Sequence, residues 1–449
     1  MFDVREKPKS VTRALLVGAW WKPQTVEEAR SLLEELGELV DTLGLTVAGQ
    51  NLAKIERPQA SYLVGTGKAE EVALQAKAQE CDVIIFDNEL TPGQQRKWEE
   101  LSGLAVIDRE EVILDIFNGR ARTHEARLQV ELARMEYSLP RLARLWGHLS
   151  RQQGGGLGGK GEGESQLEID RRLVRRRIDT VKADLEEVRS RRATQRKQRE
   201  RTPVPHAAIV GYTNAGKSSL LKKMTGADVF VEDKLFATLD PTTRRIDLPG
   251  GQPLLLTDTV GFVRKLPHRL VEAFKSTLEE ALLSDFLVHL LDASQPEIFA
   301  FHKTTMDVLA ELGAQDKRIL TVFNKIDLLG PDDPILNGLR RHFPDALFVS
   351  TRSGAGLDEL QGRMADQLAG RVETVELLLP AARGDLLSSL HRAGHVLSTD
   401  YTDAGVHVHA SVPIKLIASL APYRVEPGAP APVVATDTPA EAPRALSEV

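Results

Sequence analysis

Short apolar runs alternate with segments of helical periodicity in the first part of the chain. Ala14–Ala19 is typical of a buried strand, and Thr25–Leu43 repeats its apolar residues at helical spacing. Val83–Phe86 and Ala105–Asp108 are further apolar runs, with helical segments between them. Strands that alternate with helices indicate a sheet of parallel character. We therefore expect residues 1–120 to form an N-terminal α/β domain.

The next part of the chain, residues 121–202, is charged and predicts a projection of two long helices. The helical stretches are residues 124–150, where Pro140 is expected to introduce a kink, and residues from about 165 to 200. The run from Gly154 to Gly163 is too rich in glycine for a helix interior. It predicts a flexible tip that joins the two helices as an antiparallel pair.

Alternation of apolar runs and helical segments resumes in residues 203–372 and predicts a doubly wound α/β domain. Residues 373–425 contain two strand-like segments on either side of a helical one, which predicts a small C-terminal α/β unit. Residues 426–449 are rich in proline and alanine, and we expect a disordered tail. The predicted fold class is therefore α/β.

Composition narrows the environment of the chain. No apolar run approaches the roughly 18 residues that a membrane helix needs, and no secretory signal is visible. Cys81 is the only cysteine, which excludes a disulfide within the chain. These features predict a cytoplasmic protein with no membrane anchor, and we expect a monomer when it is free.

The clearest chemical signal follows the apolar run Ala207–Val210. It has the Gly-x-x-x-x-Gly-Lys-Ser pattern of a phosphate-binding loop, in which glycines let the backbone N–H groups turn toward phosphates. Lys217 is placed to reach the β and γ phosphates, and the Ser218 hydroxyl to bind Mg²⁺. The expected nucleotide contacts in this loop are Gly211, Tyr212, Thr213, Asn214, Ala215, Gly216, Lys217, Ser218 and Ser219.

Two later segments predict the groups that meet the γ-phosphate. Asp258 follows an apolar strand and is expected to hold Mg²⁺ through water, while the Gly261 N–H contacts the γ-phosphate. A loop between the two motifs offers Thr238 to both the metal and the γ-phosphate. The predicted metal ligands are Ser218, Thr238 and Asp258. The predicted catalytic residues are Lys217, Asn214, Thr238 and Gly261.

Two further segments predict selection of guanine. Asn324, Lys325 and Asp327 follow another apolar strand, and the Asp327 carboxylate can accept from the guanine N1–H and 2-amino groups. Adenine would leave that carboxylate unpaired, so discrimination should be large. Ser350, Thr351 and Arg352 follow the next strand and are expected to touch the base. Five such elements in order predict an enzyme that binds GTP and hydrolyses it to GDP.

Several motifs together resemble the HflX family of ribosome-associated GTPases, over roughly residues 10–370. They are the runs Phe236–Arg244 and Asp258–Phe262, and upstream Val64–Lys68, Phe86–Leu90, Val106–Arg109 and Gly161–Glu164. The resemblance implies an N-terminal α/β domain, a two-helix projection and a GTP-binding domain. It also implies binding to the rRNA of the large ribosomal subunit, a tip near the peptidyl-transferase centre, and separation of stalled or idle ribosomes into subunits.

The sequence departs from the family pattern in two of its motifs. The tip reads Lys160-Gly161-Glu162-Gly163-Glu164, where the family has Arg-Gly-Pro-Gly-Glu, so it gains flexibility and a negative charge near RNA. Thr351 stands where the family has alanine, which alters the surroundings of the base.

Phe262 occupies the position at which Ras-like proteins carry a water-orienting glutamine, so intrinsic hydrolysis is expected to be slow. Asn214 suggests one source of help, because in cation-dependent relatives an asparagine here helps to place K⁺ against the phosphates. The same residue is also an ordinary turn former, so both interpretations stay open. The ribosome is the other expected contributor, by ordering the loops around Thr238 and Phe262.

The basic segment also has two interpretations. Residues 120–201 hold 21 Lys and Arg against 12 Asp and Glu, although the whole chain has a net charge of −6. A solvated helix face is one explanation, and a phosphate-binding face centred on Arg171–Arg177 is the other. The alternatives to a ribosomal GTPase are one that assists tRNA or rRNA modification, and a nucleotide-gated module that binds a non-ribosomal partner.

A smaller motif, Gly65-Thr66-Gly67-Lys68, resembles a fragment of a phosphate loop and raises the possibility of a second nucleotide site. It lacks the first glycine and the full spacing of such a loop. We therefore favour a tight structural turn.

Overall fold

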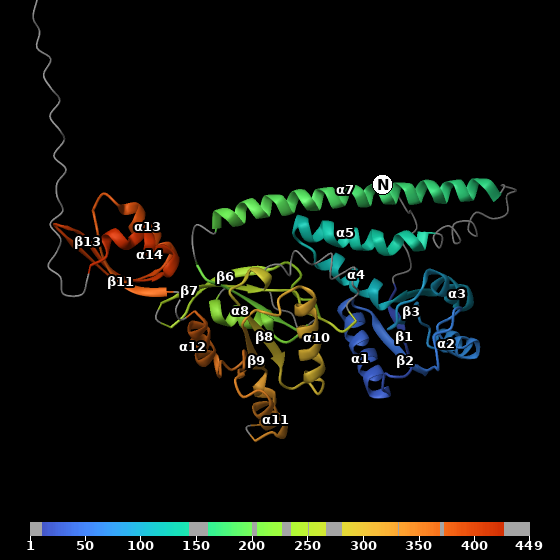
Figure 1. Ribbon diagram of the computed structural model, residues 1–449. Coiled ribbons are helices and arrows are strands. Elements are labelled where there is room, and N and C mark those ends of the chain that lie inside the picture. Colours follow the sequence, from blue (N-terminus) through green and yellow to red (C-terminus); the bar gives the residue numbers. More distant parts are fainter. Residues whose placement is uncertain are drawn as a thin grey trace, which may run out of the picture. The chain divides into compact units, whose positions relative to one another are not determined.

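The computed structural model describes the chain in eight stretches that together contain two compact units. One unit holds the N-terminal sheet, the two long helices and most of the central sheet, and the other holds the C-terminal sheet (Figure 1). None of the helices in these stretches is long and apolar enough to cross a membrane. The described stretches are residues 11–142, 160–199, 204–226, 235–249, 251–265, 281–330, 332–368 and 372–425.

A four-stranded parallel sheet forms the N-terminal domain, in the order β2-β1-β3-β4. Its first helix begins at a capping box, in which the Thr25 hydroxyl and the Glu28 carboxylate accept each other's backbone N–H. The elements are β1 (Arg13–Trp20), α1 (Val26–Thr42), β2 (Thr46–Lys54), α2 (Thr66–Ala78), β3 (Val83–Phe86), α3 (Pro92–Ser102), β4 (Ala105–Asp108) and α4 (Arg109–Arg120).

The predicted parallel sheet is confirmed, but two elements of this domain escaped prediction. Strand β2 contains the polar run Gly49-Gln50-Asn51, which interrupts the apolar pattern of an edge strand. Helix α4 buries Val112, Ile113, Leu114, Ile116 and Phe117, so its apolar residues form a block without a clear helical period.

The predicted helical projection is present, with corrected ends. The first helix, α5 (His124–Ser138), ends before Pro140, which lies in the 3₁₀ turn η1 (Leu139–Arg141). The rest of that predicted helix, residues 143–150, lies outside the described residues. Residues 143–159, which include most of the predicted glycine-rich tip, lie outside the described residues. Helix α7 (Lys160–Arg199) begins about five residues earlier than expected and includes Gly161 and Gly163. Glycine is tolerated better at a helix start than in its interior, and the acidic residues there complement the helix dipole.

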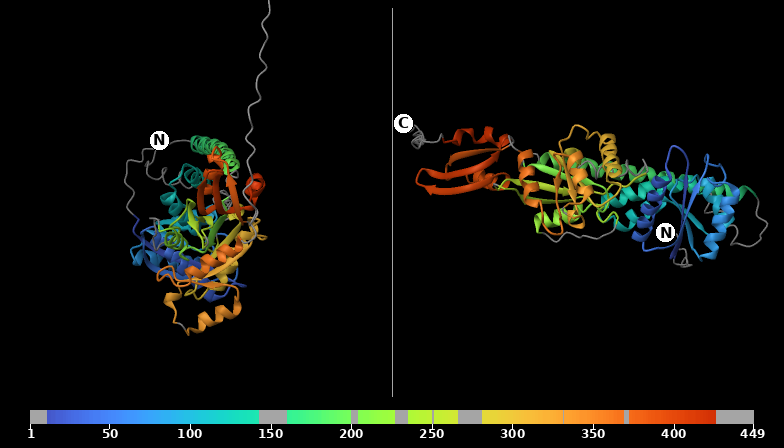
Figure 2. Two further views of the ribbon diagram at one scale, coloured as in Figure 1. Left: turned by 90° about the vertical axis from the view of Figure 1, so that its left-hand side faces the viewer. Right: turned by 90° about the horizontal axis from the view of Figure 1, so that it is seen from below.

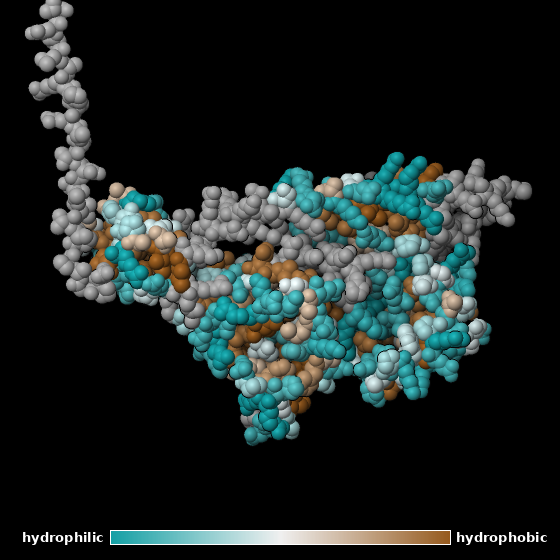
Figure 3. All heavy atoms as spheres, viewed as in Figure 1, coloured by the Kyte–Doolittle hydropathy of each residue, from teal (hydrophilic) through white to brown (hydrophobic). Residues whose placement is uncertain are grey.

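Helices α5 and α7 lie side by side and run in opposite directions (Figures 1 and 2). A small apolar cluster of Leu128, Val181 and Leu185 joins them, and Arg177 pairs with Glu131 at 2.8 Å. Hydrophilic side chains are prominent along the described part of α7 (Figure 3).

The central domain is built on a six-stranded sheet in the order β10-β9-β8-β5-β7-β6, and the strands from β10 to β7 pair in parallel. Successive strands leave β5 in both directions, so the carboxyl end of β5 opens at the switch point where such sheets bind ligands. The elements are β5 (His206–Gly211), α8 (Lys217–Thr225), β6 (Thr242–Asp247), β7 (Pro253–Asp258), β8 (Phe286–Asp292), α10 (Ile298–Glu311), β9 (Ile319–Asn324), η2 (Ile326–Leu328), α11 (Pro334–His342), β10 (Leu347–Phe348) and α12 (Leu357–Gln367).

The C-terminal unit is an antiparallel sheet in the order β11-β13-β12, covered by two helices. Its inner face carries Val375, Leu377, Val408 and Val412, all of which are buried. Strand β12 was not predicted, because its sequence is mostly polar and lies half exposed. The predicted tail, residues 426–449, lies outside the described residues. The elements are β11 (Val372–Leu379), α13 (Gly384–Ala393), β12 (His395–Thr402), β13 (Gly405–Pro413), α14 (Ile414–Leu420) and η3 (Ala421–Tyr423).

Candidate active site

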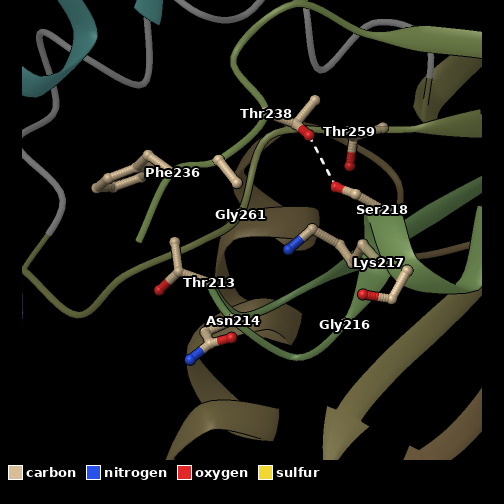
Figure 4. Close-up of a pocket in the computed structure, with 11 residues that line it drawn as sticks. Thr213, Asn214, Gly216, Lys217, Ser218, Phe236, Thr238, Thr259 and Gly261 are labelled. Carbon is tan, nitrogen blue, oxygen red and sulfur yellow. Dashed lines mark hydrogen bonds between the residues drawn. The ribbon is translucent and has the colours of Figure 1, made fainter. Parts of the chain in front are cut away.

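The predicted phosphate loop connects the carboxyl end of β5 to the start of α8, and its two glycines are required by geometry. A Cβ atom at Gly211 would lie 2.1 Å from the carbonyl oxygen of Leu290, and one at Gly216 would lie 2.3 Å from Asn324 Nδ2. Gly216 also has a positive φ of 95°, which glycine adopts without strain. The loop lines a pocket with residues of the two later motifs, as Figure 4 shows. The lining residues are Thr213, Asn214, Gly216, Lys217, Ser218, Ser219, Phe236, Ala237, Thr238, Thr259 and Gly261.

The Lys217 ammonium group lies at the centre of this loop. Its Nζ donates to the carbonyl oxygens of Tyr212 at 2.7 Å and of Gly211 at 3.2 Å. Burial lowers the pKa of Lys217 to about 8, and the nearby Asp258 carboxylate acts in the opposite direction. The group therefore remains mainly protonated at neutral pH and supplies a positive charge inside the pocket.

The three predicted metal ligands converge at one point. Ser218 Oγ donates to Asp258 Oδ2 at 2.7 Å, Thr238 Oγ1 donates to the same oxygen at 2.9 Å, and the two hydroxyls lie 2.8 Å apart (Figure 4). Burial raises the pKa of Asp258, while Lys217 and the two hydroxyls lower it. The other carboxylate oxygen, Oδ1, is buried without a hydrogen-bond partner among the described residues. Such a set of oxygens fits a hard divalent cation such as Mg²⁺.

Gly261 brings the third phosphate-sensing segment against the loop. A Cβ atom there would lie 2.8 Å from Thr213 Cα and 2.9 Å from Lys217 Nζ. The next residue, Phe262, donates its N–H to Gly211 O at 3.1 Å and accepts from Thr213 N at 2.8 Å. Its side chain is 1% exposed and packs in the hydrophobic core, so it does not face the pocket.

The predicted guanine-binding residues lie together, and each makes different contacts. Asn324 donates to Ala215 O at 2.9 Å and accepts from Thr351 N at 3.0 Å, so it joins the phosphate loop to the last motif. Lys325 forms an ion pair with Asp292 at 2.8 Å.

The last motif, Ser350 to Arg352, follows β10, and its contact with the base stays a prediction. Ser350 is buried and its hydroxyl donates to Asp327 Oδ1 at 2.6 Å, which places it behind the carboxylate. The side chain of Arg352 is exposed.

A group of buried polar residues that was not predicted lies beside the phosphate loop. The Tyr212 hydroxyl donates to Glu35 Oε1 at 2.6 Å, and Glu35 also pairs with Arg109 at 2.6 Å and with Arg264 at 2.8 Å. One sequence signal pointed to this cluster, because Glu35 falls on the otherwise apolar face of α1.

Comparisons with known proteins agree with this site. Residues 206–325 match the family described as 50S ribosome-binding GTPase, residues 30–118 match the GTP-binding GTPase N-terminal family, and residues 120–199 match the GTP-binding GTPase middle region. The protein from Akkermansia muciniphila named GTPase HflX is 51% identical over 425 residues, which cover 92% of this chain and 97% of that protein. The chain belongs to the HflX family of GTPases.

A second relative of the same name agrees with this family assignment. GTPase HflX of Escherichia coli is 42% identical over 360 residues, covering 80% of this chain and 84% of that protein. A crystal structure of a GTP-binding protein from Sulfolobus solfataricus with GDP is 24% identical and covers 80% of this chain and 99% of that chain, with a TM-score of 0.43. The resemblance inferred from the motifs is thus confirmed, and the chain is a GTP-hydrolysing enzyme of a ribosome-associated family.

The Gly65–Lys68 motif forms the start of α2, as a structural turn would. Gly65 is the N-cap of that helix, and Lys68 pairs with Glu71 at 2.7 Å on the surface. The neighbouring Tyr62 carbonyl accepts from Trp98 Nε1 at 3.0 Å, which ties the turn to α3.

Proposed function

We propose that this GTPase binds the rRNA of the large ribosomal subunit and separates stalled or idle ribosomes into subunits. The observation that supports the proposal is the exposed arginine face of α7. Arg172, Arg175 and Arg176 are exposed on the part of α7 that lies alongside α5. Arginine suits phosphate recognition because its planar guanidinium donates two parallel hydrogen bonds.

The contacts between the two helices support a role for these arginines in binding phosphate groups and not only in contact with solvent. Other charges of α7 pair with α5, as Arg177 does with Glu131 and Lys182 does with Glu136, both at 2.8 Å. The outward arginines are presented by a 40-residue helix that could follow an RNA backbone over several phosphates.

At the nucleotide site, the contacts described above support the following roles. Lys217 would exchange its bonds to loop carbonyls for oxygens of the β and γ phosphates, and the Gly261 N–H would meet the γ-phosphate. Asp327, held by Ser350, would accept from guanine. Ser218, Thr238 and Asp258 would hold Mg²⁺, which neutralises charge on the transferred phosphoryl group.

Asn214 would help a K⁺ ion to approach the phosphates. It lines the pocket in a left-handed conformation with φ of 60°, which asparagine adopts more readily than most residues. Phe262 is buried and offers no group to orient water, so the free protein should hydrolyse GTP slowly. Contact with the ribosome would then supply the catalytic help that Phe262 does not give.

The testing experiment is GTP turnover with and without large ribosomal subunits, in K⁺ and in Na⁺ buffer, together with co-sedimentation on subunits. The test variant is Arg172→Glu/Arg176→Glu. The matched control is Lys77→Glu/Lys303→Glu, which reverses two exposed charges on α2 and α10. We expect the test variant to lose both binding and stimulation, and the control to retain them.

Each outcome distinguishes between functions. Stimulation by subunits that the test variant loses would support the ribosomal role. Turnover that subunits do not change would reject it and direct attention to a modification enzyme or another partner. Subunit splitting is then measured directly by light scattering with GTP, and its absence would restrict the function to binding.

A further inference from the structure

The Tyr212 side chain joins the phosphate loop to a segment of the chain that follows Gly261. Its hydroxyl oxygen accepts from the Arg264 backbone N–H at 2.7 Å and donates to Glu35 Oε1 at 2.6 Å. The ring stacks on Phe301 at a centroid distance of 4.0 Å and an interplanar angle of 13°, and the residue is 6% exposed. One hydroxyl therefore connects three segments that are far apart in the sequence.

The carboxylate that receives this hydroxyl is itself held rigidly. Glu35 is 6% exposed and accepts from Arg109 Nη2 at 2.6 Å and from Arg264 Nε at 2.8 Å. Arg109 is 3% exposed and also donates to Asp87 at 2.8 Å. A buried carboxylate with several donors has little freedom to move, because each lost bond would leave a buried polar group unsatisfied.

Polar contacts hold the segment after Gly261 at Phe262, Arg264 and Lys265. Phe262 bonds to the phosphate loop through its backbone, and Arg264 is held through its backbone and its side chain. Lys265 pairs with Asp87 at 2.6 Å. These contacts place Gly261 at a fixed distance from Lys217, and both residues are expected to meet the γ-phosphate.

Both loops are closed on the metal-binding residues in this arrangement. Thr238 lies 2.9 Å from the Asp258 carboxylate, with Ser218 at 2.7 Å, so the described positions are those in which the three oxygens can share one cation. An attachment that holds the segment after Gly261 keeps Gly261 beside Lys217, and these are the two groups predicted to meet the γ-phosphate.

We infer that Tyr212 is a positioning residue for GTP hydrolysis, because its hydroxyl fixes the backbone at Arg264 against the buried Glu35 and so sets the place of Gly261. The hydroxyl is directed away from the pocket, since its partners are Glu35 and Arg264. Its loss should therefore slow the chemical step and leave nucleotide binding nearly unchanged. Misplacing a catalytic group by about 1 Å costs up to about a hundredfold in rate.

The inference concerns intrinsic hydrolysis only and does not depend on the ribosomal role. The test is the Tyr212→Phe variant in single-turnover hydrolysis at saturating protein, with GDP affinity measured separately. The matched control is Tyr137→Phe, which removes another buried hydroxyl that lies 3.1 Å from the Asp108 and Glu111 carboxylates of the N-terminal domain.

We expect Tyr212→Phe to lower the hydrolysis rate at least about fivefold, with GDP affinity within about twofold of the parent. Hydrogen exchange at the Arg264 amide should accelerate in the same variant, and Tyr137→Phe should change neither. An unchanged rate, a raised rate, or an equal loss of rate and GDP affinity would overturn the inference.

A second variant covers the case in which Tyr212→Phe does not fold. Glu35→Asp keeps the negative charge beside Arg109 but withdraws the oxygen from the Tyr212 hydroxyl. It should slow hydrolysis with GDP affinity retained, and a parental rate in that variant would also overturn the inference.

Discussion

Asp240 accepts a hydrogen bond from the backbone N–H of Thr123 at 3.1 Å. Thr123 is the N-cap residue of helix α5, and Asp240 belongs to a loop more than a hundred residues away in the sequence. The same carboxylate accepts from the Arg122 N–H at 3.0 Å and from the Thr123 hydroxyl. Thr238, which reaches the metal-binding residues, lies two positions before Asp240. A movement of this loop should therefore disturb the hydrogen bonds at the start of α5.

The first prediction is that Asp240→Ala loosens both ends of this contact. Loss of the hydrogen bonds to this exposed carboxylate costs about 1 kcal/mol, which corresponds to about fivefold faster local exchange. Hydrogen exchange should accelerate in peptides covering residues 124–127 and 236–239. The control is Asp333→Ala, because Asp333 caps α11 by accepting from Ile335 N at 2.8 Å. Faster exchange in α5 alone would contradict the coupling.

A second prediction concerns Asp327, the carboxylate proposed to bind the guanine base. Ser350→Ala removes the hydroxyl that donates to Asp327 Oδ1 at 2.6 Å. Because hydrogen bonds to charged groups are worth about 1.5 kcal/mol or more, affinities for GTP and GDP should both fall about tenfold. The turnover rate at saturating GTP should not change, since the base lies away from the phosphates.

The measurement is equilibrium binding of GDP and of IDP, which lacks the 2-amino group. The preference for GDP over IDP should narrow in Ser350→Ala. Ser353→Ala is the control, because that exposed residue belongs to the same loop and its hydroxyl accepts from Ala355 N at 3.3 Å. Affinities within about twofold of the parent would contradict a supporting role for Ser350.

The difference between what the sequence predicted and what it did not has a physical explanation. The phosphate loop follows β5, while Asp258 and Asn324 are the last residues of β7 and β9, so local pattern and strand direction were enough to bring them to one edge of the sheet. The contact between Glu35 and Tyr212 joins residues 177 positions apart. No local pattern encodes such a pair, and only the placement of one glutamate on the apolar face of α1 indicated that it had a buried partner.

The helix ends were predicted incorrectly for a different reason, because rules for proline and glycine in helix interiors were applied to residues near the ends. Pro140 was expected to kink a long helix, but it lies in a 3₁₀ turn where its missing N–H has little cost. Gly161 and Gly163 were expected to exclude a helix, although they fall in its first turns. Propensity is a weak guide at helix ends, where tertiary packing and capping decide the boundary.

A third prediction concerns the metal. Removing divalent ions with a chelator should abolish GTP turnover, and adding Mg²⁺ should restore it. In Thr238→Ala the half-saturating Mg²⁺ concentration for turnover should rise about tenfold, since one oxygen of the predicted ligand set is lost. Affinity for GDP should remain within about twofold of the parent, because GDP lacks the γ-phosphate that the Thr238 loop is predicted to reach.

The control for this prediction is Thr225→Ala. It removes a hydroxyl that donates to Leu221 O at 2.8 Å at the far end of α8. An unchanged Mg²⁺ dependence in Thr238→Ala would show that the hydroxyl is not a metal ligand. An equal shift in the control would point to a general loss of stability instead.

The last prediction is an acid sensitivity centred on His289 in strand β8. This side chain is fully buried, and neither ring nitrogen has a hydrogen-bond partner among the described residues. Burial, followed by the charges of His302 and Lys217, lowers the pKa of His289 to about 3. The pKa of His302, whose ring centroid lies 5.1 Å away, is lowered in the same direction by burial and by His342.

A histidine with a lowered pKa in the folded state binds fewer protons there than in the unfolded chain, where its pKa is about 6.5. Between about pH 6.5 and pH 3, acidification therefore favours unfolding, by up to about 1.4 kcal/mol per pH unit for this group. The stability that neutral His289 contributes is complete above about pH 6.5 and is lost as the pH falls.

The measurement is the urea midpoint of the central domain between pH 7.5 and pH 5, followed by hydrogen exchange in β8 and β9. His289→Leu should flatten the fall in stability on the acid side, because leucine has a similar volume and no proton to bind. His391→Leu, at an exposed position on α13, should retain the slope of the parent. A parental slope in His289→Leu would show that other groups, and not this buried imidazole, cause the loss of stability in acid.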